Sequence, residues 1–178
     1  MRSALRLALF IAVFPSAASQ DPSAAVEQIK AAFLYKFASY VEWPVGAFKE
    51  AESPLVIGVA GADDIADELE RVVAGRNVSG RSVRVRRLTG GDNAGKCCQI
   101  VFIGSRNELA HVRELLGSTQ GHPVLTVTDA DAGHPKGSII NFLEATDRVR
   151  FDISRDAAER NGLQLRSQLL AVARQVTP

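Results

Sequence analysis

The sequence predicts a single α/β domain with a largely parallel sheet flanked by helices and an antiparallel hairpin in its C-terminal third. Three short apolar runs, at residues 54–60, 100–103 and 124–127, alternate with segments of helical periodicity, which is typical of strands buried on both faces. The last third holds two strand-like runs, 138–143 and 148–153, joined by a short polar segment, and this predicts the hairpin. A chain of 178 residues suits one domain of this kind.

The first 19 residues have the order of a cleaved secretory signal peptide, so residues 20–178 form the expected exported domain. Arg2 and Arg6 supply the charged start, and the apolar run 7–14 is followed by a proline and small residues. A membrane anchor is the alternative, but a span needs about 20 apolar residues. The alanine- and arginine-rich composition indicates a bacterial source, and the expected compartment is therefore the periplasm.

The first part of the exported chain predicts a helix over residues 24–41, whose apolar face combines Ile29, Phe33, Phe37 and Tyr40. Asp63 and Asp64 are expected to cap a second helix, which follows the first buried strand. Residues 83–86 alternate valine with arginine, which indicates a half-exposed strand near an edge of the sheet.

In the second part, Asn107 and Ser154 are the expected N-caps of two further helices. The helix after Ser154 should end at Asn161 and Gly162. A last helix is predicted to present Leu165, Leu169, Val172 and Val176 on one face. The expected core consists of Phe33, Phe37, Ile57, Val101, Ile103, Val127 and Phe151.

Charge and motifs exclude several classes of function. After the first 20 residues, the chain has 19 basic and 20 acidic side chains. A nucleic-acid-binding protein needs a clustered excess of basic residues, so this class of function is excluded. The chain has no phosphate-binding loop, nucleophile elbow or zinc-protease motif, so we predict no catalytic residue, no cofactor and no enzymatic activity. His134 follows Asp129 and Asp131, which would permit a weak metal site, but a solvated loop is the preferred interpretation and no metal is predicted.

Two sets of residues are candidates for binding. Tyr40, Trp43 and Phe48 are expected either to form a partner-binding aromatic surface or to close the core. A ligand cleft is the hypothesis for the ends of the buried strands, because parallel sheets bind ligands there. The alternative is that the glycines of this set only permit tight turns; its members are Gly61, Gly104, Ser105 and Asp129.

The two cysteines, Cys97 and Cys98, are adjacent. Three arrangements are open: one thiol in the core and one outward, which we prefer; a strained vicinal disulfide; or a bridge to another chain. Their oxidation state is left undecided by the sequence.

Several blocks, in order, resemble the YfiR-like family of periplasmic regulatory proteins. The first block that carries the resemblance is the segment KAAFLYKFASYVEWP, and the match as a whole extends from about Glu27 to Val176. The blocks are residues 30–44, 54–59, 98–103, 124–129, 137–142, 148–153 and 162–170. Adjacent cysteines depart from the separated disulfide pairs that stabilise the best-known type.

The resemblance implies regulation and not catalysis. It implies a protein that binds the periplasmic part of an inner-membrane diguanylate cyclase and represses it, which lowers cyclic-di-GMP and biofilm formation. An outer-membrane lipoprotein would draw the regulator away, and a homodimer is an open expectation. The alternative is a periplasmic small-ligand-binding or sensor domain that acts with a histidine kinase.

Overall fold

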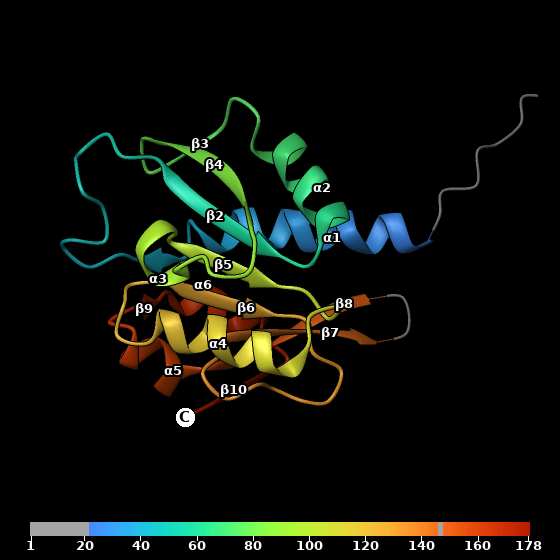
Figure 1. Cartoon of the computed structure of the whole chain (residues 1–178). Coiled ribbons are helices and arrows are strands. Elements are labelled where there is room, and N and C mark those ends of the chain that lie inside the picture. Colours follow the sequence, from blue (N-terminus) through green and yellow to red (C-terminus); the bar gives the residue numbers. More distant parts are fainter. Residues whose placement is uncertain (1–21, 146–147) are drawn as a thin grey trace, which may run out of the picture.

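The computed structural model describes residues 22–145 and 148–178, so the expected signal peptide lies outside the described residues. The strands of the main sheet are β2 (Leu55–Ala60), β3 (Asn77–Val78), β4 (Arg81–Leu88), β5 (Ile100–Ile103), β6 (Leu125–Thr128), β7 (Ile140–Ala145), β8 (Arg148–Ser154) and β10 (Gln175–Thr177). Within the described ranges they form one sheet in the order β10-β8-β7-β6-β5-β2-β4-β3 (Figure 1). A separate antiparallel pair joins β1 (Val41–Glu42) to β9 (Gln164–Leu165).

The pairing confirms the predicted fold class. β2 pairs in parallel with β4 on one side and with β5 on the other, and β6 and β7 extend the parallel part. β7 and β8 form the predicted antiparallel hairpin, with Phe142 opposite Phe151. β4 lies next to the edge strand β3, as its alternation of valine and arginine predicts.

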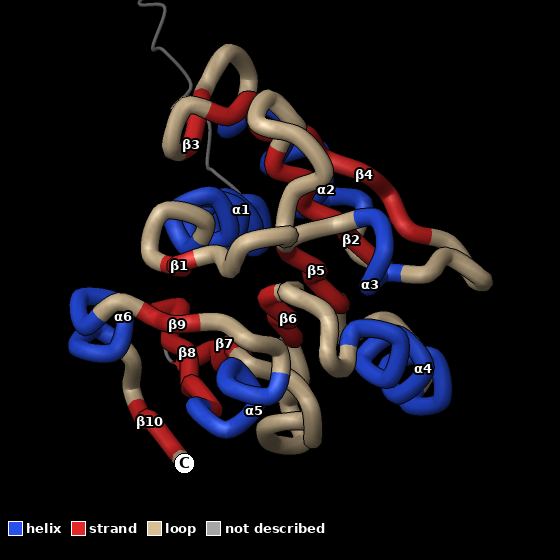
Figure 2. Tube along the Cα trace, turned by 90° about the vertical axis from the view of Figure 1, so that its left-hand side faces the viewer, coloured by secondary structure: helices blue, strands red, loops and turns tan. Residues whose placement is uncertain are grey.

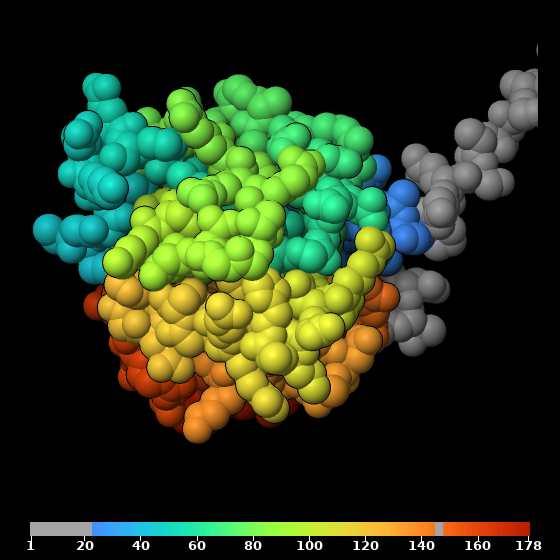
Figure 3. All heavy atoms as spheres, viewed as in Figure 1, coloured from blue at the N-terminus to red at the C-terminus, as the bar shows by residue number. Residues whose placement is uncertain are grey.

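Helices cover both faces of the sheet (Figure 2). The helices are α1 (Pro22–Phe37), α2 (Asp63–Val73), α3 (Ala94–Cys97), α4 (Leu109–Thr119), α5 (Arg155–Arg160) and α6 (Ser167–Val172). α1 and α2 pack on one face and share the larger apolar core with β2, β5 and β6. α3 and α4 bury a second core on the opposite face, where α4 forms much of the molecular surface (Figure 3).

Aromatic side chains fill the centre of the larger core. The ring of Phe37 stacks on Phe142 at 5.8 Å and meets Phe151 edge-on at 5.1 Å between centroids, which are favourable arrangements for aromatic pairs. Of the predicted core residues, Phe37, Ile57, Val101, Ile103, Val127 and Phe151 are buried. Phe33 is half-buried and packs against the same rings.

The first helix differs from its prediction. α1 ends at Phe37, so Tyr40 lies beyond it, and Ile29 is 42% exposed. The buried stripe instead passes through Lys30, Leu34 and Phe37. The hydrophobic periodicity placed the buried face one position too early in the helix, because lysine was not expected to be buried.

Two expectations for the C-terminal half are also wrong. Asn107 makes no cap; Glu108 precedes α4, and no side chain caps this helix. The predicted last helix is only the six residues of α6, because Leu165 pairs in β9 and Val176 in β10. Strand pairing with β1 and β8 overrides the local helical spacing. The cap at Ser154 is confirmed by the hydrogen bond that Ala157 N donates to its hydroxyl.

The cysteines form a vicinal disulfide between Cys97 and Cys98, and no free cysteine remains among the described residues. The preferred expectation of two separate thiols is therefore wrong, although Cys98 is buried and Cys97 only partly so. The bond packs against β2 at Gly58. A Cβ there would lie 2.8 Å from Leu88 Cδ1 and 3.0 Å from Cys98 Sγ, so the close approach requires a glycine.

Candidate functional site

A cleft of about 340 Å³ opens where the chain reverses its direction across the sheet. From β2 the chain passes through α2 to β4, and it later returns to β5 on the other side of β2. Doubly wound sheets bind ligands at this point, outside the carboxyl ends of the strands. All four predicted cleft residues, Gly61, Gly104, Ser105 and Asp129, line this cleft. Their role as a ligand site remains a prediction.

The two glycines hold the loops after β2 and β5 close together. A Cβ on Gly104 would lie 2.8 Å from the carbonyl oxygen of Gly61. Asn107 fixes this contact, because its Nδ2 donates 2.9 Å hydrogen bonds to the carbonyls of Ala60 and Gly104. Gly61 has a φ of +63°, which favours glycine. The glycines thus have a structural reason to be present as well as a place in the cleft wall.

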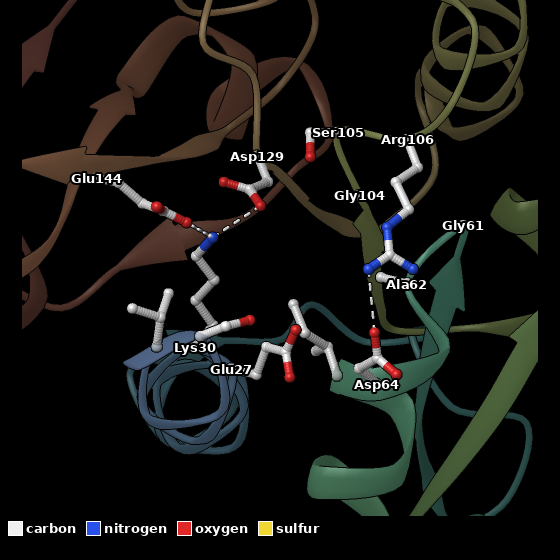
Figure 4. Close-up of a pocket in the computed structure, with 13 residues that line it drawn as sticks. Glu27, Lys30, Gly61, Ala62, Asp64, Gly104, Ser105, Arg106, Asp129 and Glu144 are labelled. Atoms are coloured by element: carbon white, nitrogen blue, oxygen red, sulfur yellow. Dashed lines mark hydrogen bonds and ion pairs between the residues drawn. The ribbon is translucent and has the colours of Figure 1, made fainter. Parts of the chain in front are cut away.

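Lys30 is the buried charge of the site (Figure 4). It projects from α1, and its side chain is 3% exposed. Its Nζ donates a 2.8 Å hydrogen bond to Asp129 Oδ2, after β6, and a 2.6 Å hydrogen bond to Glu144 Oε1, in β7. Burial by itself would lower the pKa of Lys30, but these hydrogen bonds and the two negative charges outweigh it and raise the pKa. Lys30 therefore joins α1 to the carboxyl edge of the sheet as an ammonium ion.

The opposite wall carries a second, more exposed ion pair. Arg106, which follows β5, donates from Nη2 to Asp64 Oδ2 at 3.1 Å, across to the first turn of α2. Both side chains are more than half exposed, so this pair contributes little to stability. Its position instead sets the charges that a molecule entering the cleft would meet.

Sequence reasoning missed Lys30, Glu144, Arg106 and Asp64. A signal existed for Lys30, since it stands four residues after Val26 and four before Leu34 on the stripe that packs inward. Glu144 had no comparable signal, because its approach to Lys30 depends on how β7 pairs with β6.

One comparison identifies the family. The family model described as YfiR/HmsC-like (DUF4154) matches residues 27–174, which cover most of the chain.

The chain belongs to the YfiR/HmsC-like family.

Membership confirms the resemblance seen in the sequence and indicates a periplasmic regulator of cyclic-di-GMP signalling, in a family of regulatory proteins. No helix in the described part of this YfiR-like chain is long and apolar enough to span a bilayer.

The aromatic candidates of the YfiR-like chain gather at the other end of α1. Tyr40, Trp43 and Phe48 are half-buried and pack against the larger core. Trp43 meets Phe48 edge-on with centroids 6.2 Å apart, and the Arg81 guanidinium lies 3.9 Å from the Phe48 ring centroid. Both earlier interpretations therefore keep a structural basis, since one side of each ring is in the core and another reaches solvent.

His134 has a structural contact in the YfiR-like fold. Its Nε2 lies 2.8 Å from the carbonyl oxygen of Ser138, within the loop that joins β6 to β7. Across residues 22–145 and 148–178, no three His, Cys, Asp or Glu side chains gather closely enough to hold a metal ion.

Proposed function

We propose that this protein is a periplasmic repressor that binds the periplasmic part of an inner-membrane diguanylate cyclase. Binding holds the cyclase inactive, so cyclic-di-GMP and biofilm formation fall. The observation that carries the proposal is the family match over residues 27–174. Its action is stoichiometric, and an outer-membrane lipoprotein that competes for the regulator would release the cyclase.

The partner surface that we assign to this function is the aromatic group Tyr40, Trp43 and Phe48. Val45, in the same loop, is fully exposed and adds apolar surface beside Trp43. Aromatic anchors contribute a disproportionate share of binding energy at protein interfaces. Together these side chains offer an apolar patch of the kind that such an interface uses.

The direct test is capture of the partner. The tagged, exported protein is used to pull down proteins from detergent-solubilised inner membrane, and cyclic-di-GMP is measured in a strain that lacks the gene. We expect a diguanylate cyclase in the bound fraction and raised cyclic-di-GMP after deletion. A bound fraction without a cyclase, together with unchanged cyclic-di-GMP, would refute the proposal.

Trp43→Ala tests the surface. We expect the variant to fold with a loss of about 2 kcal/mol, below the 3–5 kcal/mol of a fully buried tryptophan, and to bind the partner about 30-fold less tightly. Tyr35→Ala is the matched control, since Tyr35 is a half-buried aromatic residue of α1 outside this loop. A folded Trp43→Ala protein with unchanged partner affinity would exclude Trp43 from the interface.

A second candidate function is a sensor domain that acts with a histidine kinase. The cleft at the carboxyl ends of β2 and β5 favours it, because a sensor needs a ligand site. A histidine kinase in the pull-down, with cyclic-di-GMP unchanged by deletion, would support this function in place of the first.

A further inference from the structure

The edge of the sheet along β4 is largely uncovered. On one side, residues 83–88 pair with β2. On the other side, β3 pairs only with Arg81 and Ser82, and no strand or loop backbone in the described part of the chain hydrogen-bonds to residues 83–88 there. Figure 2 shows β4 at the outer border of the sheet. These six residues therefore present backbone N–H and C=O groups with which another chain can pair.

The β4 edge is long and charged, whereas the opposite edge of the sheet is short. β10, at that opposite edge, has three residues. Natural proteins protect edge strands by keeping them short or by placing charges on them, which prevents unselective pairing. Three exposed arginines, Arg84, Arg86 and Arg87, have this position in β4. Charges of one sign exclude many strands, but they favour a strand that carries the opposite sign.

The arginine face of β4 has an excess of positive charge. Side chains alternate between the faces of a strand, so Arg84 and Arg86 share one face and Val85 lies on the other, half-buried against the larger core. Arg84 has no ion pair with any described residue, whereas Arg86 pairs with Asp92. Lys96 is exposed in the cleft that Arg86 and Asp92 also line. These residues together bring three positive charges against one carboxylate.

Arg87 does not contribute to this excess. It lies on the opposite face, where α2 packs on β4, and it pairs with three acids of that helix, Asp63, Asp67 and Glu70. These acids would repel an acidic side chain on their own face. A strand that joins β4 therefore meets attraction for acids on the Arg84 face alone.

We propose that residues 83–88 of β4 bind an extended segment of another protein that alternates acidic and apolar residues and joins the sheet as a further strand. The backbone of this segment pairs with the open edge of β4. Its acids lie beside Arg84 and Arg86, and its apolar side chains lie beside Val85. In this mode of recognition the backbone hydrogen bonds provide affinity and the alternating side chains provide specificity.

A second copy of the chain does not suit this edge. It would bring the arginines of two β4 strands side by side, and like charges on neighbouring strands are destabilising. The proposal is also independent of the proposed repressor function, because it concerns a property of the isolated protein and a surface other than Tyr40, Trp43 and Phe48. Failure of one therefore leaves the other standing.

Fluorescence polarisation of the purified, exported protein tests binding with a labelled peptide of eight alternating glutamate and valine residues. A lysine–valine peptide reverses the charge. Two further forms of the glutamate peptide are N-methylated at all glutamate amides or at all valine amides, so each lacks the donors of one edge. We expect saturable binding of the glutamate peptide, about tenfold weaker binding of the lysine peptide, and about tenfold weaker binding of one methylated form than of the other. No binding of the glutamate peptide, or equal binding within either comparison, overturns the proposal.

Hydrogen exchange measured by mass spectrometry locates the bound peptide. We expect exchange in residues 83–88 to slow when the glutamate peptide binds, and exchange in residues 175–177 of β10, the other edge strand, to stay unchanged. Protection of β10 in place of β4 would put the peptide on the wrong edge and overturn the proposal. The same follows if the protein without peptide is a dimer in which residues 83–88 are already protected, because a second copy would then occupy the edge.

Arg84→Glu tests the charge that the proposal uses. Arg84 is exposed, so the variant should fold, and we expect its affinity for the glutamate peptide to fall about tenfold. Arg160→Glu is the matched control, because Arg160 is an exposed arginine of α5, which lies beside β10 at the opposite edge. Unchanged affinity in Arg84→Glu, or an equal loss in Arg160→Glu, would show that the peptide is not held along the arginine face of β4.

Discussion

Lys30 occupies an environment that its chemistry opposes, since lysine is almost never fully buried unless it is paired. Its two carboxylate partners make burial possible. Lys30→Met keeps the length of the side chain and removes the charge, which leaves the poorly exposed Asp129 without its cation. We expect a loss of about 3 kcal/mol in the free energy of unfolding, measured with urea.

The matched control for this loss is Lys36→Met, because Lys36 is exposed on the same helix. Its free energy of unfolding should stay within about 0.5 kcal/mol of the parent. Equal values for the two variants would show that the Lys30 ion pairs contribute nothing to stability.

The pH dependence of the Lys30 contribution has a defined sign. Its pKa in the folded protein is raised above the ordinary value of 10.5, despite the opposing effect of burial, by the hydrogen bonds and charges of Asp129 and Glu144. A group with a raised folded pKa stabilises fully below its unfolded pKa and loses that contribution as pH rises through the folded pKa. The difference in stability between the parent and Lys30→Met should therefore be constant around neutral pH and shrink above pH 10.5. If the difference in stability instead shrinks as the pH is lowered through neutral, a group other than Lys30 is responsible.

At the scale of elements, the contact between β2 and the disulfide at the end of α3 depends on the missing side chain of Gly58. Gly58→Ala would place a methyl group 2.8 Å from Leu88 Cδ1, and we expect a loss of about 1–3 kcal/mol from overpacking. Gly90→Ala is the control, because nothing lies within 4 Å of a Cβ at Gly90. Thermal unfolding of the two variants compares them directly, and a Gly58→Ala protein as stable as Gly90→Ala would mean that β4 and α3 move aside freely.

The disulfide itself should contribute less to the stability of the fold than this contact at Gly58. Adjacent cysteines close no long loop, so they restrict the unfolded chain little. We expect Cys97→Ser with Cys98→Ala to unfold within about 1 kcal/mol of the parent, whereas Cys98→Ser costs more because it places a hydroxyl in an apolar site. Failure of the Cys97→Ser, Cys98→Ala protein to fold would show that the bond is essential to the α3–β5 connection.

At the scale of the whole molecule, the family assignment and the start of the sequence lead to one prediction about the exported form. The mature chain should begin near Ser19 or Gln20 and appear in an osmotic-shock fraction. Mass spectrometry of the intact protein from that fraction measures its first residue. Recovery of the chain with Met1 from the cytosol would contradict export.

The fold class and the position of the cleft were predictable because both depend on short runs of neighbouring residues in the sequence. Buried parallel strands appear as short apolar runs, and the residues after them, Gly61, Gly104 and Asp129, must meet at one edge of the sheet. The ion pairs inside the cleft were not predictable in the same way. Glu144 reaches Lys30 through the pairing of β7 with β6, which is a long-range contact. Asn107 was wrongly predicted to be an N-cap because an asparagine side chain can either cap a helix or, as here, hydrogen-bond to the backbone carbonyls of neighbouring loops.

The direction of the strands decides where a fusion to this protein would interfere. β7 ends at the cleft, whereas β8 runs antiparallel to it and β10 parallel to β8, so Pro178 emerges at the opposite edge of the sheet (Figure 1). An affinity tag on the C-terminus therefore lies away from the cleft. A tag attached directly before α1 would instead stand next to the cleft, because Ser23 and Val26, in the first turns of α1, line it.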